Sequence, residues 1–126
     1  VDAIMSAHVV NKRLDDKMLP GTLSTKIISG LLRNFLGFNG VVFSDDMQMQ
    51  AITNHYGLDV AIEKSINSGI DVLLFCNNQL EENKVSTDKV ISIIKDKIQS
   101  GEIEYSRIEE SFNRIKKLKQ SFDITN

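Results

Sequence analysis

The segment from Gly40 to Gln50 constrains the fold of this chain more than any other stretch. It reads Gly-Val-Val-Phe-Ser-Asp-Asp-Met-Gln-Met-Gln, so apolar residues of high strand propensity lead directly into two adjacent carboxylates, Asp45 and Asp46. An ordinary surface turn offers Gly, Asn or Pro at this place. Because binding sites on parallel sheets lie just past the carboxyl ends of the strands, the segment predicts a buried strand that carries acid to such a site. The alternative is that one Asp caps the following turn while the other is solvated.

Two further apolar segments also end in polar side chains. Residues 1–7 read as a strand that ends on His8, and residues 70–75 form a continuously apolar strand that is followed by Asn77. Near-continuous apolar strands are typical of parallel sheets that are buried on both faces, so the predicted order is βαβαβ. Right-handed crossovers then place His8, Asp45 and Asn77 at one edge of the sheet.

Amphipathic helices alternate with these strands. Ser24 can cap a helix that runs to about Leu36 and stops at Gly37, and a second helix is expected over residues 58–68, closed by Gly69. The residues expected on the inner faces are Ile27, Ile28, Leu31, Leu32 and Phe35 in the first helix and Val60, Ala61, Ser65 and Ile66 in the second.

The last third of the chain is predicted to form two more helices. One spans residues 87–99 and ends at Gly101, and the other begins with a capping box formed by Ser106 and Glu109. The apolar stripe expected in this final helix consists of Ile108, Phe112, Ile115 and Leu118. Its basic residues, which are expected to complement the helix macrodipole, are Arg114, Lys116, Lys117 and Lys119.

The composition indicates a single globular domain. The 126 residues are 41% hydrophobic and 25% charged, which is ordinary for such a domain. No apolar run approaches the roughly 20 residues that span a bilayer, so no membrane partner is expected. The net charge of -2 gives no reason to expect a nucleic-acid partner. Neither a cofactor nor a metal is expected, and the single cysteine, Cys76, with no secretory leader predicts a cytoplasmic location.

Several motifs follow one another along the chain in a characteristic order. They are Ile-Met-Ser-Ala-His-Val (4–9), Leu-Pro-Gly-Thr-Leu-Ser (19–24) and Leu-Leu-Arg-Asn-Phe-Leu-Gly-Phe-Asn-Gly-Val-Val-Phe-Ser-Asp-Asp-Met (31–47). The segments 68–74 and 107–119 continue the likeness. In this order the motifs resemble glycoside hydrolase family 3, and the bacterial β-N-acetylhexosaminidase branch of the family is the nearest match over almost the whole chain.

The resemblance implies a fold. Residues 1–126 are expected to be the C-terminal portion of the catalytic domain of this family. That portion is an α/β arrangement of about three βα units with parallel strands, plus terminal helices, from a TIM-like (β/α)8 barrel. Such a barrel typically needs about 250 residues. The expected partners are therefore the missing N-terminal half of the barrel and a carbohydrate substrate.

The resemblance also implies a reaction, the retaining hydrolysis of terminal β-linked N-acetylglucosamine, as in peptidoglycan sugar turnover. Asp45 matches the nucleophile of the family, and His8, Asp46, Met47 and Asn77 are expected to bind substrate or support the site. A retaining enzyme needs an ionised carboxylate near the anomeric carbon and a second group that protonates the leaving oxygen. In this branch the second group resembles an Asp-His pair on a loop upstream of this chain, and His8 is not that histidine. The chain alone is therefore expected to be inactive.

Two residues depart from the pattern of the family, and alternative functions stay open. Gly21 stands where Ala is common, and Gln48 stands where a small residue is common.

A β-glucosidase of the same family is one alternative, and a non-catalytic structural or binding piece is another. A receiver-like signalling domain also has a parallel sheet and an Asp that accepts a phosphoryl group at a strand end, although it needs five βα units and this sequence predicts three strands.

Overall fold

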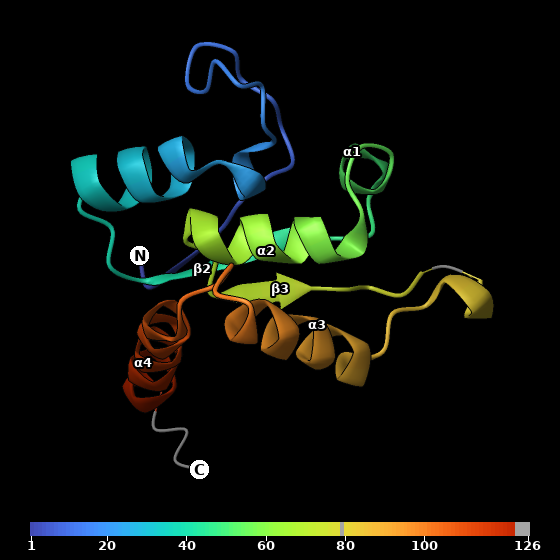
Figure 1. The fold of residues 1–126 in the computed structure, drawn as a ribbon. Helices are drawn as coiled ribbons and strands as arrows, with labels where there is room; N and C mark the ends of the chain where they lie inside the picture. Colours follow the sequence, from blue (N-terminus) through green and yellow to red (C-terminus); the bar gives the residue numbers. More distant parts are fainter. Residues whose placement is uncertain (79, 123–126) are drawn as a thin grey trace.

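A three-stranded parallel sheet lies at the centre of the computed structural model, which describes residues 1–78 and 80–122 (Figure 1). The strands are β1 (Ala3–Met5), β2 (Val41–Asp46) and β3 (Val72–Leu74), and they are hydrogen-bonded in the order β1-β2-β3. Both neighbouring pairs are parallel. The predicted α/β order βαβαβ is therefore confirmed, although β1 and β3 are shorter than the predicted segments.

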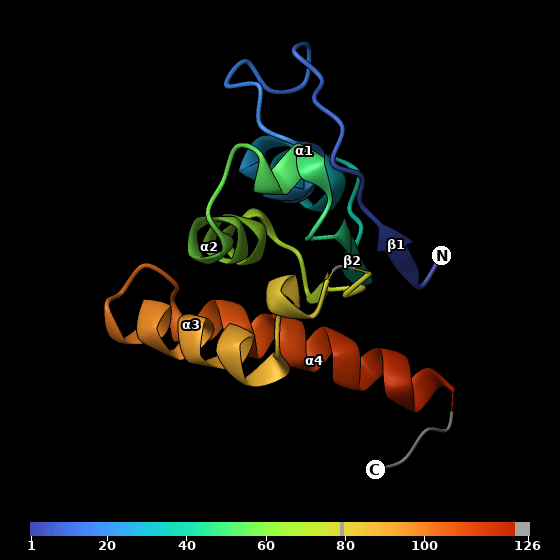
Figure 2. The ribbon, with the colours of Figure 1, turned by 90° about the vertical axis from the view of Figure 1, so that its right-hand side faces the viewer.

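Helices connect the strands and follow the sheet. They are η1 (Gly21–Leu23), η2 (Lys26–Phe35), α1 (Gln50–Thr53), α2 (Leu58–Ser68), η3 (Glu81–Asn83), α3 (Thr87–Gln99) and α4 (Tyr105–Ser121). Figure 2 shows α3 and α4 below α2, on the side away from α1. The predicted capping box at Ser106 is wrong, because α4 begins one residue earlier and no side chain caps it. In the part of the chain that the structure describes, no helix combines the length and apolar character needed to cross a membrane.

The two faces of the sheet differ in burial. On one face Val42 is 0% exposed, and Leu73 packs against all three hydrophobic clusters that the helices form with the sheet. Met5, Phe43 and Val72 are lateral neighbours in the sheet and share the opposite face. Met5 is 60% exposed, and the other two residues are half-buried. Helices therefore cover one face of the sheet and leave an apolar row partly exposed on the other.

The helix η2 is wound as a π-helix, and Leu36 N–H donates to Leu31 O, five residues back. The hydroxyl of Ser24 accepts from Ile27 N–H at 3.2 Å, so the predicted cap is confirmed. Phe35, which was predicted to face the sheet, is 81% exposed. The prediction assumed about 3.6 residues per turn. The wider π-turn rotates Phe35 away from the sheet.

A buried carboxylate, Asp71, joins the start of β3 to the surrounding elements. Its side chain is 0% exposed. One oxygen, Oδ2, accepts from the Arg33 guanidinium at 2.7 Å and from Val42 N–H at 3.0 Å. The other oxygen, Oδ1, accepts hydrogen bonds from three side chains of α4: Ser111 at 2.7 Å, Arg114 at 3.0 Å and Arg107 at 3.4 Å. Asp71 therefore connects η2, β2, β3 and α4.

This cluster decides which side of α4 faces the sheet. Arg107, Ser111 and Arg114 are three to four residues apart, so they lie on one face of the helix and all reach Asp71. Phe112, predicted to belong to the buried stripe, is instead 64% exposed. The prediction for Arg114 was also wrong, because this cation pairs with Asp71 rather than only complementing the helix end.

Burial and bonding act on the Asp71 carboxyl in opposite directions. Burial favours the neutral acid and works to raise the pKa. Hydrogen bonds from Ser111 and the Val42 amide, together with the charges of Arg33 and Arg114, outweigh burial and hold the pKa of Asp71 below its ordinary value. The carboxylate is therefore ionised in the folded chain at neutral pH.

Replacing Asp71 with Asn should lower the free energy of unfolding by about 3 kcal/mol or more, because buried arginines lose their counter-charge. Urea unfolding at neutral pH measures this change. Asp16→Asn is the control, since the Asp16 side chain is 77% exposed and pairs with Lys26 at the surface. Equal effects of the two substitutions would contradict the role assigned to Asp71.

The stability difference between the wild type and Asp71→Asn should also depend on pH. A carboxyl whose pKa is lowered by folding contributes its full stabilisation above its unfolded pKa of about 3.9 and loses it as the pH falls through the folded value. The difference should therefore be constant between about pH 7 and about pH 5 and should shrink below about pH 4. Urea titrations across this range measure how the stability difference changes with pH. A difference that widens in acid would contradict the lowered pKa of Asp71.

Candidate functional site

A bulge interrupts β2 directly before the second of the two carboxylates. Between Phe43 and Asp46, β2 spans one residue more than the facing stretch of β3. The buried Ser44 compensates for the lost ladder bond, because its Oγ accepts from Leu74 N–H at 2.9 Å. Bulges at sheet edges commonly re-aim a side chain. Asp45 therefore lies at a position where the backbone departs from regular alternation.

The two carboxylates are bonded differently although they are neighbours. Oδ1 of Asp45 accepts from Asp46 N–H at 2.8 Å, and within residues 1–78 and 80–122 its Oδ2 has no hydrogen-bond partner. Oδ1 of Asp46 accepts from Gln48 N–H and from Cys76 N–H, each at 3.1 Å. Asp46 thus ties the connection after β2 to the connection after β3. Over the same ranges Oδ2 of Asp46 has no hydrogen-bond partner either, so the two carboxylates differ in the number of N–H groups that their Oδ1 atoms accept.

His8 links the end of β1 to the turn that carries Asp45 and Asp46, here called the acidic turn. This contact confirms that His8 lies at the predicted edge of the sheet. Its side chain is 7% exposed, and Nε2 donates to the main-chain oxygen of Asp46 at 2.9 Å. Nδ1 lies 2.9 Å from the Thr22 hydroxyl, which is 2.8 Å from the Ser6 hydroxyl. Because a carbonyl oxygen only accepts, Nε2 carries the proton, and in the neutral ring Nδ1 accepts from Thr22. The ring therefore orients the main chain beside Asp45.

Asn77 lies at the same edge, as predicted, and organises the β3–α3 connection. It adopts a left-handed backbone conformation with φ of 52°, which Asn tolerates better than most residues. Its side chain accepts from Val85 N–H at 2.9 Å and donates to Val85 O at 3.1 Å. Its own N–H donates to Gln48 Oε1 at 2.8 Å. The Asn77 amide is therefore engaged within the chain.

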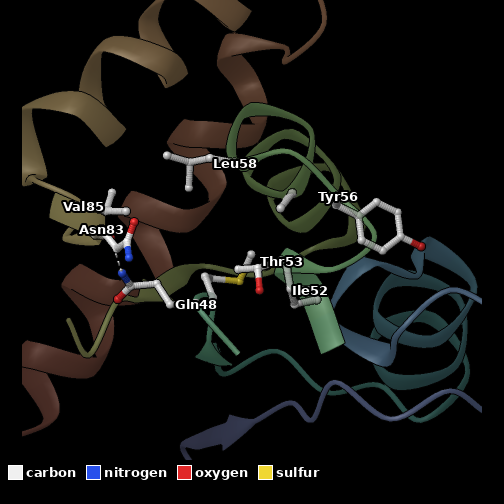
Figure 3. Close-up of a pocket in the computed structure, with 9 residues that line it drawn as sticks. Gln48, Ile52, Thr53, Tyr56, Leu58, Asn83 and Val85 are labelled. Carbon is white, nitrogen blue, oxygen red and sulfur yellow. Dashed lines mark hydrogen bonds between the residues drawn. The ribbon is translucent and has the colours of Figure 1, made fainter. Parts of the chain in front are cut away.

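Met47 belongs to the hydrophobic core rather than to the open edge. It is 2% exposed, and its sulfur lies 3.7 Å from the Ser65 hydroxyl. Met47 borders a pocket of about 380 Å³ (Figure 3). The pocket is lined by Met47, Gln48, Ile52, Thr53, Tyr56, Leu58, Ala61, Asn83 and Val85. Neither Asp45 nor Asp46 is among these uncharged residues.

Three residues that shape this edge, Thr22, Ser44 and Gln48, were not predicted as site residues. Each acts through a hydrogen bond to a residue far away in the chain. The unusual size of Gln48 is a signal that could have identified it. Over the described ranges, no three His, Cys, Asp or Glu side chains are grouped as metal ligands.

The chain is similar to known glycosidases in sequence. Residues 1–118 match the family model described as the glycosyl hydrolase family 3 N terminal domain. The beta-hexosaminidase of Actinobacillus pleuropneumoniae serotype 5b (strain L20) is 32% identical over 135 residues, which cover 97% of this chain and 39% of the relative. The beta-hexosaminidase of Tolumonas auensis is 40% identical over 79 residues, which cover 63% of this chain and 23% of that relative. The chain spans less than two-fifths of the length of these relatives.

Solved structures share the arrangement of the sheet and helices. The glycoside hydrolase family 3 beta-N-acetylglucosaminidase from Paenibacillus sp. str. FPU-7 aligns with a TM-score of 0.87 and 34% identity, over 98% of this chain and 23% of that chain. The beta-N-acetylglucosaminidase from Thermotoga maritima aligns with a TM-score of 0.80 and 28% identity, over 92% of this chain and 24% of that chain.

Replacing Thr22 with Val should lower the free energy of unfolding by about 1–3 kcal/mol, because it keeps the shape of the side chain and leaves His8 Nδ1 and the Ser6 hydroxyl without their partner. Thr22 is 0% exposed, so water cannot restore these bonds. Thr25→Val, at an exposed position, is the matched control and should change the value little. Urea unfolding of both variants makes the comparison, and equal losses would contradict the His8 network.

Proposed function

The chain belongs to glycosyl hydrolase family 3, and from this premise we propose that it carries the nucleophile of an enzyme that hydrolyses terminal β-linked N-acetylglucosamine with retention. The names of the relatives, beta-hexosaminidase and beta-N-acetylglucosaminidase, support this substrate class. Turnover of cell-wall sugars in the cytoplasm is the setting that we propose. A β-glucosidase activity is the alternative within the family. The receiver-like interpretation is wrong, because the matched family model covers residues 1–118.

The single observation that carries the proposal is the unequal bonding of the two carboxylates. A nucleophile must present a free oxygen to the anomeric carbon, and among the described residues Oδ2 of each carboxylate has no partner, so the assignment rests on what each Oδ1 accepts: one N–H, that of the next residue, at Asp45. Asp46 accepts two main-chain N–H groups from two different connections, which suits a residue that holds the site together. We therefore assign the attack to Asp45 and the supporting role to Asp46.

In the proposed reaction the ionised Asp45 attacks the anomeric carbon, and the bond from this carbon to the leaving oxygen breaks as a general acid protonates that oxygen. Water then hydrolyses the glycosyl ester, and the acid, now a base, takes a proton from this water. The N–H of Asp46 stabilises the Asp45 carboxylate, and His8 holds the Asp46 carbonyl in place. Asn77 shapes the neighbouring connection, and Met47 supports the turn from the core.

We propose that the general acid comes from earlier strands of a TIM-like barrel, of which residues 1–126 form the C-terminal portion. The apolar row formed by Met5, Phe43 and Val72 supports this proposal, since the remaining strands of a barrel would cover it. An apolar hollow of about 340 Å³ beside β1 and η2 is a second such surface. The isolated chain should therefore fail to turn over substrate.

The assignment of the nucleophile is tested by comparing Asp45→Ala and Asp46→Ala in the full-length protein that contains this chain. With a 4-nitrophenyl N-acetyl-β-glucosaminide, Asp45→Ala should lose about a thousandfold or more in kcat, because each loss of about 1.4 kcal/mol in transition-state stabilisation costs tenfold. Asp46→Ala should lose less. The release of 4-nitrophenolate measures both rates.

Azide provides the control for this experiment. In Asp45→Ala, azide can occupy the space that the carboxylate leaves, attack the anomeric carbon and release the phenolate, so the product should be the α-glycosyl azide. Asp46→Ala should give no such product. If Asp46→Ala alone lost activity and responded to azide, the two roles would be reversed, and if both variants stayed active, the proposed function would fail.

A further inference from the structure

One buried side chain of the acidic turn, that of Gln48, bonds to both ends of the β3–α3 connection. Gln48 is 8% exposed, and its amide bonds in two directions. Oε1 accepts from Asn77 N–H at 2.8 Å, near the start of the connection, and Nε2 donates to Asn83 O at 3.4 Å, near its end. Figure 3 shows Gln48 and Asn83 facing each other at one end of the pocket. A small residue at position 48 could reach neither partner.

Other hydrogen bonds also hold the connection. Asn77 holds Val85 through two hydrogen bonds of its side chain, and Cys76 N–H donates to Asp46 Oδ1. Most of the described positions between 76 and 86 are exposed, so little apolar burial holds this stretch in place. Its conformation therefore rests on polar contacts to the turn that carries Asp45.

We infer that Gln48 is a positioning residue that fixes the β3–α3 connection as one wall of the substrate site. This inference rests on the proposed function, because it takes the edge beside Asp45 as the place where substrate binds. Beyond the proposed function, Gln48 is assigned a role in substrate affinity. The residue acts through the connection and does not touch the reacting atoms.

The contacts around Asp45 indicate that loss of the Gln48 amide affects substrate binding and not the chemical step. Asp45 is held by Asp46 N–H and by the bulge at Ser44, and neither contact uses the side chain of Gln48. Loss of the Gln48 amide should therefore leave kcat nearly unchanged. The loosened wall must be ordered when substrate binds, and this ordering cost raises KM.

Gln48→Met in the full-length protein tests this inference, since Met keeps the length of the side chain and removes both hydrogen bonds. KM for the 4-nitrophenyl N-acetyl-β-glucosaminide should rise about tenfold, and kcat should change less than about threefold. Gln48→Glu keeps the acceptor for Asn77 N–H and loses the donor to Asn83, so its KM should rise less. Gln50→Met, at an exposed position of α1, is the matched control and should change neither constant.

Trypsin provides a readout that does not depend on activity. Lys84 lies in the connection and Arg13 lies in the distant loop before η1, and both are exposed. Gln48→Met should raise the rate of cleavage after Lys84 at least about fivefold relative to cleavage after Arg13, because a less ordered segment is cut faster. Gln50→Met should leave this ratio unchanged.

The results distinguish a failure of the role assigned to Gln48 from a failure of the proposed function. A higher KM together with faster cleavage after Lys84 supports the inference. An unchanged cleavage ratio, an unchanged KM, or a loss that falls on kcat alone overturns it. If Gln48→Met does not fold, the same criteria apply to Gln48→Glu. If the wild-type protein has no glycosidase activity, the proposed function fails, and the cleavage ratio still decides whether Gln48 holds the connection.

Discussion

The ionised side chain of Asp71 is the interaction on which the rest of the structure depends. A carboxylate that is removed from water is tolerated only when donors surround it, and here Arg33, Arg107 and Arg114 supply the charge. These arginines belong to η2 and α4, which lie far apart in the sequence. Their common partner forces both helices to meet at the start of β3. The burial of one charge therefore sets the arrangement of four elements.

Strands β2 and β3 carry the ion cluster around Asp71 at one end and the acidic turn at the other. Val42 donates to Asp71 near the start of β2, and Asp45 and Asp46 lie at the end of the same strand. β3 likewise begins just after Asp71 and leads within a few residues to Cys76, whose N–H reaches Asp46. Because the strands are short and hydrogen-bonded to each other, a shift at the ion cluster would move the edge where the carboxylates lie. Stability at one end of the sheet and geometry at the other are therefore linked.

The acidic turn shows how the backbone separates two identical side chains. One extra residue in β2 breaks the regular pairing with β3, and Ser44 satisfies the main-chain N–H that the bulge leaves over. Asp46 then receives the N–H groups of two connections, while Asp45 receives only that of its neighbour among the described residues. The two carboxylates therefore differ in the main-chain donors that they receive and not in the side chains themselves.

The sequence by itself determined the alternation of strands and helices, the parallel sheet and the edge of the sheet at which the strand-end residues His8, Asp45 and Asn77 lie. These features follow from local patterns, since apolar continuity, helix periodicity and glycine stops act over a few residues, and parallel strands bring their carboxyl ends together. The roles of Asp45 and the other predicted site residues stay predictions. Only the tertiary structure decided what depends on contacts between distant segments.

Those contacts turned α4 so that Phe112 faces solvent and Arg114 faces Asp71. They joined Gln48 to Asn77 across two connections, and the π-winding of η2 turned Phe35 outward against its sequence period. A buried ion pair and a bridging amide leave no periodic signal, because each partner is an ordinary polar residue until the fold brings the two together.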